Sequence, residues 1–214
     1  MTAPQSVPIP AGPNKRSAFW KNQLRQWHWI SSAICLAGLL LFAVTGFTLN
    51  HAASIEAKPD TLIREFALSP ALLAQLAQAR DGQALAEPLA TAVETATGVR
   101  VSGRPAEARD GELYLDLPGP GVDSYLSIDI ESGAATYEHT SRGTIAMLND
   151  LHKGRDSGPA WGLFIDAIAI ACVIFSLTGL GLLWVHARTR PSTWPLTSLG
   201  VVLPVLLFIL FVHS

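Results

Sequence analysis

The sequence predicts a mainly α-helical membrane protein with three transmembrane helices and a small α+β domain between the first helix and the second. Three apolar runs carry this prediction, at Ile30–Leu49, Gly162–Val185 and Pro195–Val212. About twenty apolar residues, at a rise of about 1.5 Å each, match the hydrocarbon thickness of about 30 Å. Residues 52–157 are polar and contain no comparable run. The 214 residues therefore do not form one soluble core.

Charges beside the apolar runs predict how the chain crosses the membrane. Four basic residues between Lys15 and Arg25 precede the first run, and Arg188 and Arg190 follow the second. By the positive-inside rule both positions are cytoplasmic. The expected segments are a cytoplasmic tail at 1–26, transmembrane helices at 27–51, 158–187 and 195–214, a periplasmic domain at 52–157 and a cytoplasmic loop at 188–194.

The two ends of the chain lead to three further expectations. Residues 1–13 are rich in Pro, Ala and Ser, so we expect them to be disordered. The first run is too long for a cleaved signal peptide, and no small-x-small site precedes His51, which favours a retained helix. Pro204 is expected to kink the third helix.

The polar middle segment shows the periodicity of helices and strands. Leucines and isoleucines alternate with polar residues at 113–117 and at 126–130, as in half-buried strands, and 135–138 is a short third strand. Helices are expected at Ala71–Ala79, at Glu87–Thr97 with Gly98 as a left-handed cap, and at Gly143–Leu151. One helix packed on a small antiparallel sheet is the simplest architecture.

Composition excludes several functional classes. The net charge of −2, with basic residues beside the spans, gives no nucleic-acid footprint. Cys35 and Cys172 both lie in apolar runs, so there is no disulfide framework, and Met147 is the only methionine after the first residue, which disfavours a His/Met haem ligand pair. No hydrolase triad, phosphate-binding loop or covalent haem attachment motif is present.

Four histidines stand at the ends of the first two runs. His28 and His51 are 23 positions apart and therefore about 35 Å apart along a helix, so they mark opposite membrane faces. His186 then lies on the cytoplasmic face with His28, and His152 on the outer face with His51. Each alone would be an ordinary interfacial side chain. Together they predict two His/His pairs that bind haem iron.

Other residues near the spans each have more than one candidate role. Thr45–Gly46 and Thr178–Gly179 let either a flat macrocycle or a neighbouring helix approach closely, as do Gly38 and Gly181. Asp166 either accepts a proton from a ligating imidazole, pairs with Arg155, or reaches the interface. The basic residues Lys153 and Arg155 are either partners for haem propionates or interface charges. His139 and His213 are expected to be surface residues.

These motifs, in this order, resemble the PepSY-associated transmembrane proteins. The first span is similar in Trp27–Trp29, Thr45–Gly46 and Asn50–His51, and the later part in Leu151–Gly154 and Leu177–Leu180, followed by Trp184–His186. The middle segment resembles a PepSY module. The resemblance covers about residues 20 to 190.

The resemblance implies a bacterial inner-membrane protein, because relatives of this kind include ferric-siderophore reductases that hold two haem b groups between histidine pairs. It implies electron transfer to a ferric siderophore or another periplasmic iron complex. This chain has only three spans and no flavin-binding part. Two spans do not enclose a haem, so we expect a homodimer or a partner membrane subunit.

Two alternatives remain open at this point. One is a cofactor-free membrane anchor whose PepSY-like domain binds or regulates a partner protein. The other is binding of a metal ion at the outer histidines, for which the sequence offers only Glu56, Asp150 and Asp156 as further ligands.

Overall fold

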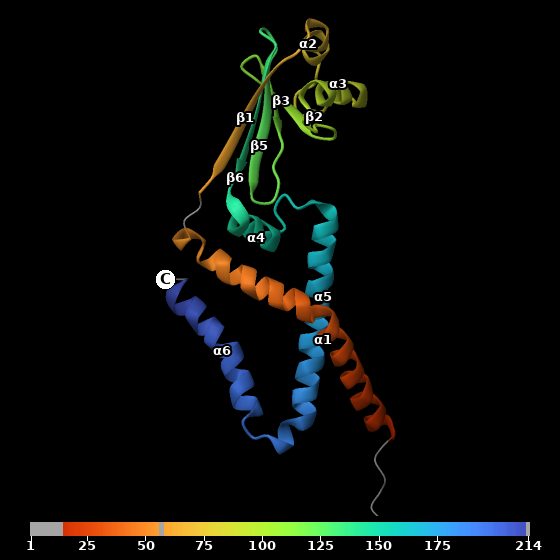
Figure 1. The fold of residues 1–214 in the computed structure, drawn as a ribbon. Helices are drawn as coiled ribbons and strands as arrows, with labels where there is room; N and C mark the ends of the chain where they lie inside the picture. The colour runs from red at the N-terminus through yellow and green to blue at the C-terminus, as the bar shows by residue number, and fades with distance from the viewer. Residues whose placement is uncertain (1–14, 56–57, 213–214) are drawn as a thin grey trace, which may run out of the picture. The chain divides into compact units, whose positions relative to one another are not determined.

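The protein is described here by a computed structural model that covers residues 15–55 and 58–212. The chain divides into two compact units. We call Met1–Leu40 with Asp166–Ser214 the helical unit, and Leu41–Ile165 the sheet unit. Figure 1 labels the helices and strands of both units. The tail at 1–13 and His213 lie outside the described residues.

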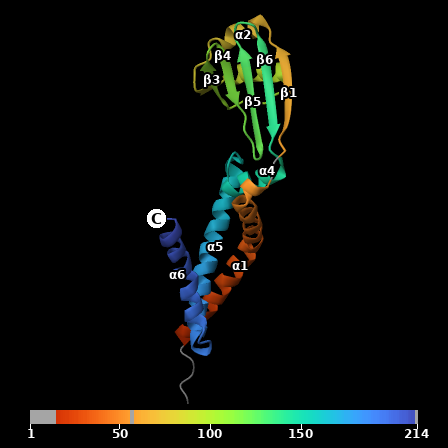
Figure 2. The same cartoon turned by 90° about the vertical axis from the view of Figure 1, so that its left-hand side faces the viewer.

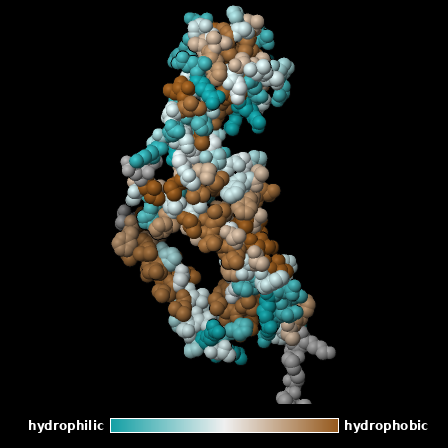
Figure 3. Space-filling view, viewed as in Figure 1, coloured by the Kyte–Doolittle hydropathy of each residue, from teal (hydrophilic) through white to brown (hydrophobic). Residues whose placement is uncertain are grey.

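Three helices are long and apolar enough to cross a membrane, as predicted. They are α1 (Lys15–Asn50), α5 (Gly158–His186) and α6 (Thr193–Phe211), with short 3-10 turns at Ala52–Ser54 and Ala187–Thr189. Hydrophobic side chains cover much of their surface (Figure 3). Helix α1 begins well before residue 27, because polar and basic residues continue a helix as readily as apolar ones do.

Small residues bring α1 and α5 together in the helical unit. Ser31 and Cys35 on α1 are 3% and 0% exposed, although they lie within an apolar span. At Gly38 the Ile168 side chain of α5 lies so close that an added Cβ would be 2.8 Å from its atoms. These three residues are spaced by four and then three positions, which places them on one face of the helix. Helices in lipid associate through such small-residue contacts.

The sheet unit contains one six-stranded antiparallel sheet in the order β1-β6-β5-β4-β3-β2 (Figure 2). The strands are β1 (Asp60–Ala67), β2 (Gln83–Ala84), β3 (Pro105–Arg109), β4 (Glu112–Asp116), β5 (Val122–Asp129) and β6 (Ala134–Ser141). The helices of this unit are α2 (Pro70–Leu76), α3 (Glu87–Thr97) and α4 (Gly143–Lys153).

Helices α2 and α3 cover one face of this sheet and form its core. Leu115 and Leu126, on neighbouring strands, are fully buried together with Leu76 of α2 and Val93 of α3. Alternate residues on each strand point to the other face. The period-two pattern at 113–117 and 126–130 therefore predicted the buried face correctly.

The sheet is larger than the sequence predicted. Helix α3 ends at Gly98 with φ of +70°, which confirms the predicted cap, and α4 is also confirmed. The predicted single helix on a small sheet is wrong, since two helices pack on six strands. Strand β1 was missed because it lies at the sheet edge and exposes both Leu62 and Ile63, which removes the alternation.

A buried acid fixes α4 to the end of the sheet. Asp150 is 3% exposed and accepts hydrogen bonds from Gly121 N at 2.9 Å and from an Arg142 guanidinium nitrogen at 2.7 Å. Arg142 Nε lies 3.0 Å from an Asp123 oxygen, an ion pair without the alignment of a hydrogen bond. A Cβ on Gly121 would lie 2.6 Å from the backbone of Met147, so α4 packs directly on the turn that precedes β5.

Candidate functional site

His28 packs against α5 at one of the two Thr-Gly pairs. Its Nδ1 lies 3.2 Å from the carbonyl oxygen of Phe175 and 3.2 Å from the hydroxyl oxygen of Thr178. The ring also stacks on Phe175, with centroids 4.6 Å apart. A Cβ added to Gly179 would lie 3.2 Å from His28 Cε1. The glycine therefore leaves the room that the imidazole occupies.

Hydrogen bonding assigns the proton on His28. A backbone carbonyl only accepts hydrogen bonds, so Nδ1 donates to Phe175. In a neutral imidazole the other nitrogen, Nε2, then keeps its lone pair. This is the tautomer in which Nε2 binds a metal while Nδ1–H is held by a backbone acceptor.

His186 has the same tautomer for a different reason. Its Nδ1 lies 2.8 Å from the carbonyl oxygen of Leu182, four positions earlier on its own helix. The side chain is exposed, and Nε2 again keeps its lone pair.

The predicted inner pair lines one cavity of the helical unit. This cavity has a volume of about 480 Å³, within the range of small-molecule sites. His28 lies on its wall from α1 and His186 from α5, and Arg190 also lines it. The remaining lining residues are Gly179, Leu182, Leu183 and Thr193. The structure thus brings two imidazoles with free Nε2 atoms and one cation to a largely apolar cavity.

His152 packs against α1 at the other Thr-Gly pair. Its Nδ1 lies 2.8 Å from the Thr45 hydroxyl oxygen, and that hydroxyl donates to the carbonyl of Leu41 at 2.9 Å. The threonine proton is therefore directed to the backbone, and His152 Nδ1 donates to the hydroxyl. Phe42 meets the ring edge-on with centroids 5.3 Å apart. A Cβ on Gly46 would lie 3.3 Å from His152 Cε1.

His51 contacts different residues from those that His152 contacts. Its Nδ1 donates to the carbonyl of Phe47 at 2.9 Å, and its ring lies against that of Phe47 with centroids 4.4 Å apart. The side chain is exposed. Like the other three histidines, it keeps the lone pair on Nε2. The contacts of His51 and of His152 are separate sets, in contrast to the cavity that His28 and His186 share.

The two Thr-Gly pairs thus have the same role in the two units. In each, a threonine hydroxyl contacts Nδ1 of a histidine from another helix, and the following glycine faces the ring. We call this arrangement the Thr-Gly contact. The sequence predicted close approach at these dipeptides, and the structure shows that an imidazole makes it.

Lys153 and Arg155 line a second cavity, of about 610 Å³, in the sheet unit. Lys58, Arg142 and Asn149 also line it, so four basic side chains face this space. Arg155 Nε lies 3.2 Å from an Asp156 oxygen, which makes Asp156 the described partner of this arginine. Asp166 is exposed on α5. Within residues 15–55 and 58–212 no group of three or more His, Cys, Asp or Glu side chains could hold a metal ion.

His139 differs from the surface residue that the sequence predicted. It is half-buried, and its Nδ1 lies 2.9 Å from the hydroxyl of Ser124 on the neighbouring strand. It lines a cleft of the sheet unit together with three arginines. No local sequence signal marks this cleft, because its arginines come from segments far apart in the chain.

Comparison with known proteins gives one match. The family model described as PepSY_TM-like matches residues 19–213, nearly the whole chain. No curated protein and no solved structure matches the chain.

Proposed function

Since the chain belongs to the PepSY_TM-like family, we propose that it is an inner-membrane haem b protein that passes electrons across the membrane. The observation that carries this proposal is the protonation pattern of its span-end histidines. His28, His51, His152 and His186 each use Nδ1 to donate a hydrogen bond, so each keeps Nε2 as a potential ligand.

The residues around the inner cavity fit a haem b group. His28 and His186 would hold the haem iron, and Arg190 would pair with a propionate. Phe175 and Leu182 fix the two imidazoles through their carbonyls, and Leu183 adds an apolar side chain to the cavity wall. Haem iron ligated in this way supplies one-electron chemistry when it is bound.

An outer haem would be held by His51 and His152. Lys153 and Arg155 follow His152 in the chain and are the candidate partners of its propionates. Thr45 orients the His152 ring by accepting its Nδ1 proton. With one haem site near each end of the spans, electrons would have a path through the bilayer.

The direction of transfer in this proposal is outward. Basic residues around Lys21 and Arg188 favour a cytoplasmic N-terminus and a periplasmic segment at 52–157, which would be the PepSY-like domain. The acceptor would be a ferric siderophore or another periplasmic iron complex, as the family resemblance implies. The donor would be quinol or a cytoplasmic reductant.

We also propose that the spans assemble with further helices, as a homodimer or with a partner membrane subunit. In the most apolar window of α6 no residue is buried, and that of α5 is only 11% buried. Two spans leave most of a haem surface uncovered, so added helices would complete the enclosure.

The first experiment is the absorption spectrum of the detergent-purified chain, oxidised and dithionite-reduced, with a pyridine haemochrome assay. We expect low-spin b-type bands and about two haems per chain. His28→Ala and His186→Ala should each remove about half of the haem, since either ligand loss opens the inner site. His213→Ala is the matched control, because the sequence gives this histidine no partner on another span.

Two outcomes would contradict the proposal. A colourless protein from haem-replete cells would remove the cytochrome and leave a cofactor-free anchor as the better account. Unchanged haem content and spectra in all four variants, His28→Ala, His51→Ala, His152→Ala and His186→Ala, would show that haem binds elsewhere.

A further inference from the structure

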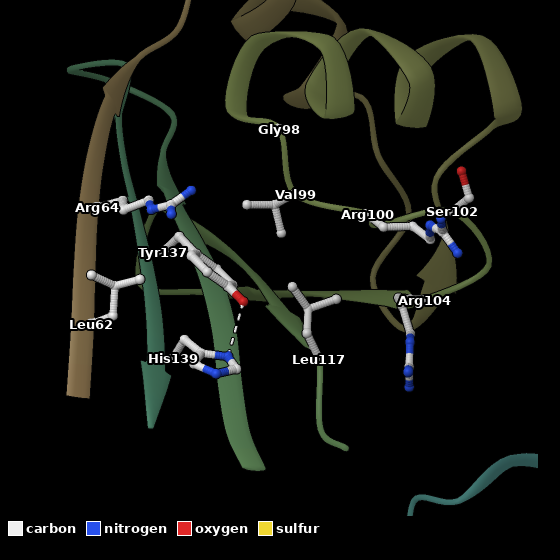
Figure 4. A pocket seen from close by; sticks show the side chains of 10 residues that line it. All are labelled: Leu62, Arg64, Gly98, Val99, Arg100, Ser102, Arg104, Leu117, Tyr137 and His139. Atoms are coloured by element: carbon white, nitrogen blue, oxygen red, sulfur yellow. Dashed lines mark hydrogen bonds between the residues drawn. The ribbon is translucent and has the colours of Figure 1, made fainter. Parts of the chain in front are cut away.

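The face of the sheet that α2 and α3 cover extends beyond them as an open cleft. On β1, Leu62 and Arg64 lie on this face, paired in register with His139 and Tyr137 of β6. The loop after α3 forms the opposite wall (Figure 4). The cleft has a volume of about 610 Å³ and is lined by Leu62, Arg64, Gly98, Val99, Arg100, Ser102, Arg104, Leu117, Tyr137 and His139.

Three arginines of this cleft have no acidic partner at ion-pair distance among the described residues. They are Arg64, Arg100 and Arg104. In the same unit Arg109 pairs with Glu107, and Arg142 pairs with Asp123 and Asp150. Arg109 and Arg142 are thus neutralised by acids, whereas the arginines of the cleft are available to a ligand.

The nearby acid Glu94 is engaged through one of its carboxylate oxygens. One of its oxygens accepts hydrogen bonds from Val101 N, Ser102 N and Ser102 Oγ at 2.8 to 2.9 Å. These bonds lower the pKa of Glu94, with a smaller contribution from the charge of Arg100. The carboxylate thus fixes the loop that carries Arg100 and Arg104, and it forms no ion pair with Arg100.

Charged side chains lie on two walls of the cleft, and apolar side chains form its floor. Figure 4 shows Arg64 on one side and Arg100 with Arg104 on the other, and Val99 and Leu117 between them. The Tyr137 hydroxyl lies 3.3 Å from His139 Nδ1, which also contacts Ser124, so these rings are held in place. Guanidinium groups on two walls suit separate oxyanion groups, and the apolar floor suits a carbon skeleton.

We propose that this cleft binds a small organic anion with two or more carboxylate groups. Separate carboxylates would bind Arg64 and the Arg100–Arg104 wall, and the carbon skeleton would lie on Val99 and Leu117. The volume is within the usual range for small-molecule sites. The proposal involves no haem group, so it stands or fails separately from electron transfer.

The test is isothermal titration of citrate into the full chain in detergent, at fixed ionic strength, with inorganic phosphate as the comparison. We expect saturable citrate binding that weakens about tenfold or more in Arg64→Gln/Arg100→Gln/Arg104→Gln, because each change removes a charge-assisted contact. Arg109→Gln is the matched control, since Arg109 pairs with Glu107 and lies outside the cleft. It should bind citrate as the unchanged chain does.

A second measurement needs no variant and therefore does not depend on how the triple variant folds. Phenylglyoxal modifies accessible arginines, and peptide mass spectrometry locates the modified sites. Citrate should protect Arg64, Arg100 and Arg104 and leave Arg109 reactive. Three results would overturn the proposal: no saturable citrate binding, equal protection of all four arginines, or phosphate binding as tight as that of citrate.

Discussion

At the scale of single residues, Thr45 and Thr178 differ in how much their histidines depend on them. Thr45 is the described acceptor for His152 Nδ1, whereas His28 Nδ1 contacts both Thr178 and the carbonyl of Phe175. Removing a hydroxyl should therefore affect the two histidines unequally. This difference allows the role of the Thr-Gly contact to be tested.

Thr45→Val should weaken haem retention at the outer site about tenfold, because outer hydrogen bonds orient a ligating imidazole and raise its basicity. Thr178→Val should have a smaller effect, since Phe175 still accepts the His28 proton. The rate at which each variant loses its haem is measured by transfer of the haem to apomyoglobin. Equal haem loss from the two variants, or none from either, would contradict this assignment.

The glycine of each Thr-Gly contact is sensitive to added volume. Gly179→Ala places a Cβ 3.2 Å from His28 Cε1, so the imidazole must shift by a few tenths of an ångström. We expect altered low-spin haem signals in electron paramagnetic resonance. Gly200→Ala on α6 is the control, because nothing lies within 4 Å of its added Cβ. A spectrum of Gly179→Ala identical to that of Gly200→Ala would argue against haem ligation by His28.

At the scale of secondary-structure elements, the ion pair of Asp150 joins α4 to the sheet. Asp150→Asn should lower the free energy of unfolding by about 3 kcal/mol, because it leaves a mostly buried guanidinium without its closest counter-charge. Denaturant unfolding of the full chain, followed by Trp fluorescence, measures the loss. Asp156→Asn changes a more exposed pair and should cost less than about 1 kcal/mol.

A side-chain hydrogen bond whose strength depends on pH joins β5 to β6 on the face opposite the core. Tyr125 donates a hydrogen bond to Glu138 at 2.7 Å, and this bond together with burial raises the pKa of Tyr125 to about 12. The ordinary tyrosine pKa is 10.0. The stabilisation is complete below pH 10 and is lost as the pH rises towards about 12, because the unfolded chain releases this proton first.

Tyr125→Phe should remove this alkaline component. The unfolding free energy of the unchanged chain should fall more steeply than that of Tyr125→Phe between pH 10 and about 12. Tyrosinate absorbance should also lose its latest-titrating component in the variant. Parallel pH dependences in the two proteins would contradict the hydrogen bond to Glu138.

At the scale of the whole molecule, the order of spans predicts which side each segment faces. Alkaline phosphatase fused after residue 110 or after the C-terminus should be active, and phosphatase fused after Thr189 should be inactive. The reason is that basic residues beside the spans keep the N-terminus and the loop after α5 in the cytoplasm. Activity of the Thr189 fusion, or inactivity of the fusion after residue 110, would reverse the proposed orientation.

Several features of this protein follow from the sequence alone. The three long helices depend on composition over about twenty residues, and the strands at 113–117 and 126–130 depend on local alternation. The cap at Gly98 depends on a single residue that readily adopts a positive φ. The histidines at the span ends were identified as ligand candidates because their positions along the chain fix their depth in a membrane.

Other features depend on contacts that no local pattern specifies. Whether His152 reaches Thr45 depends on the axial register of two helices, and the shared cavity of His28 and His186 depends on how α1 and α5 pack. Arg64, Arg100 and Arg104 meet only because β1 pairs with β6 across the sheet from the loop after α3. The sequence by itself therefore determined which residues lie in apolar helices and which strands have a buried face. Tertiary packing alone decided which side chains share a site, because convergence of distant segments is set by long-range contacts and not by periodicity.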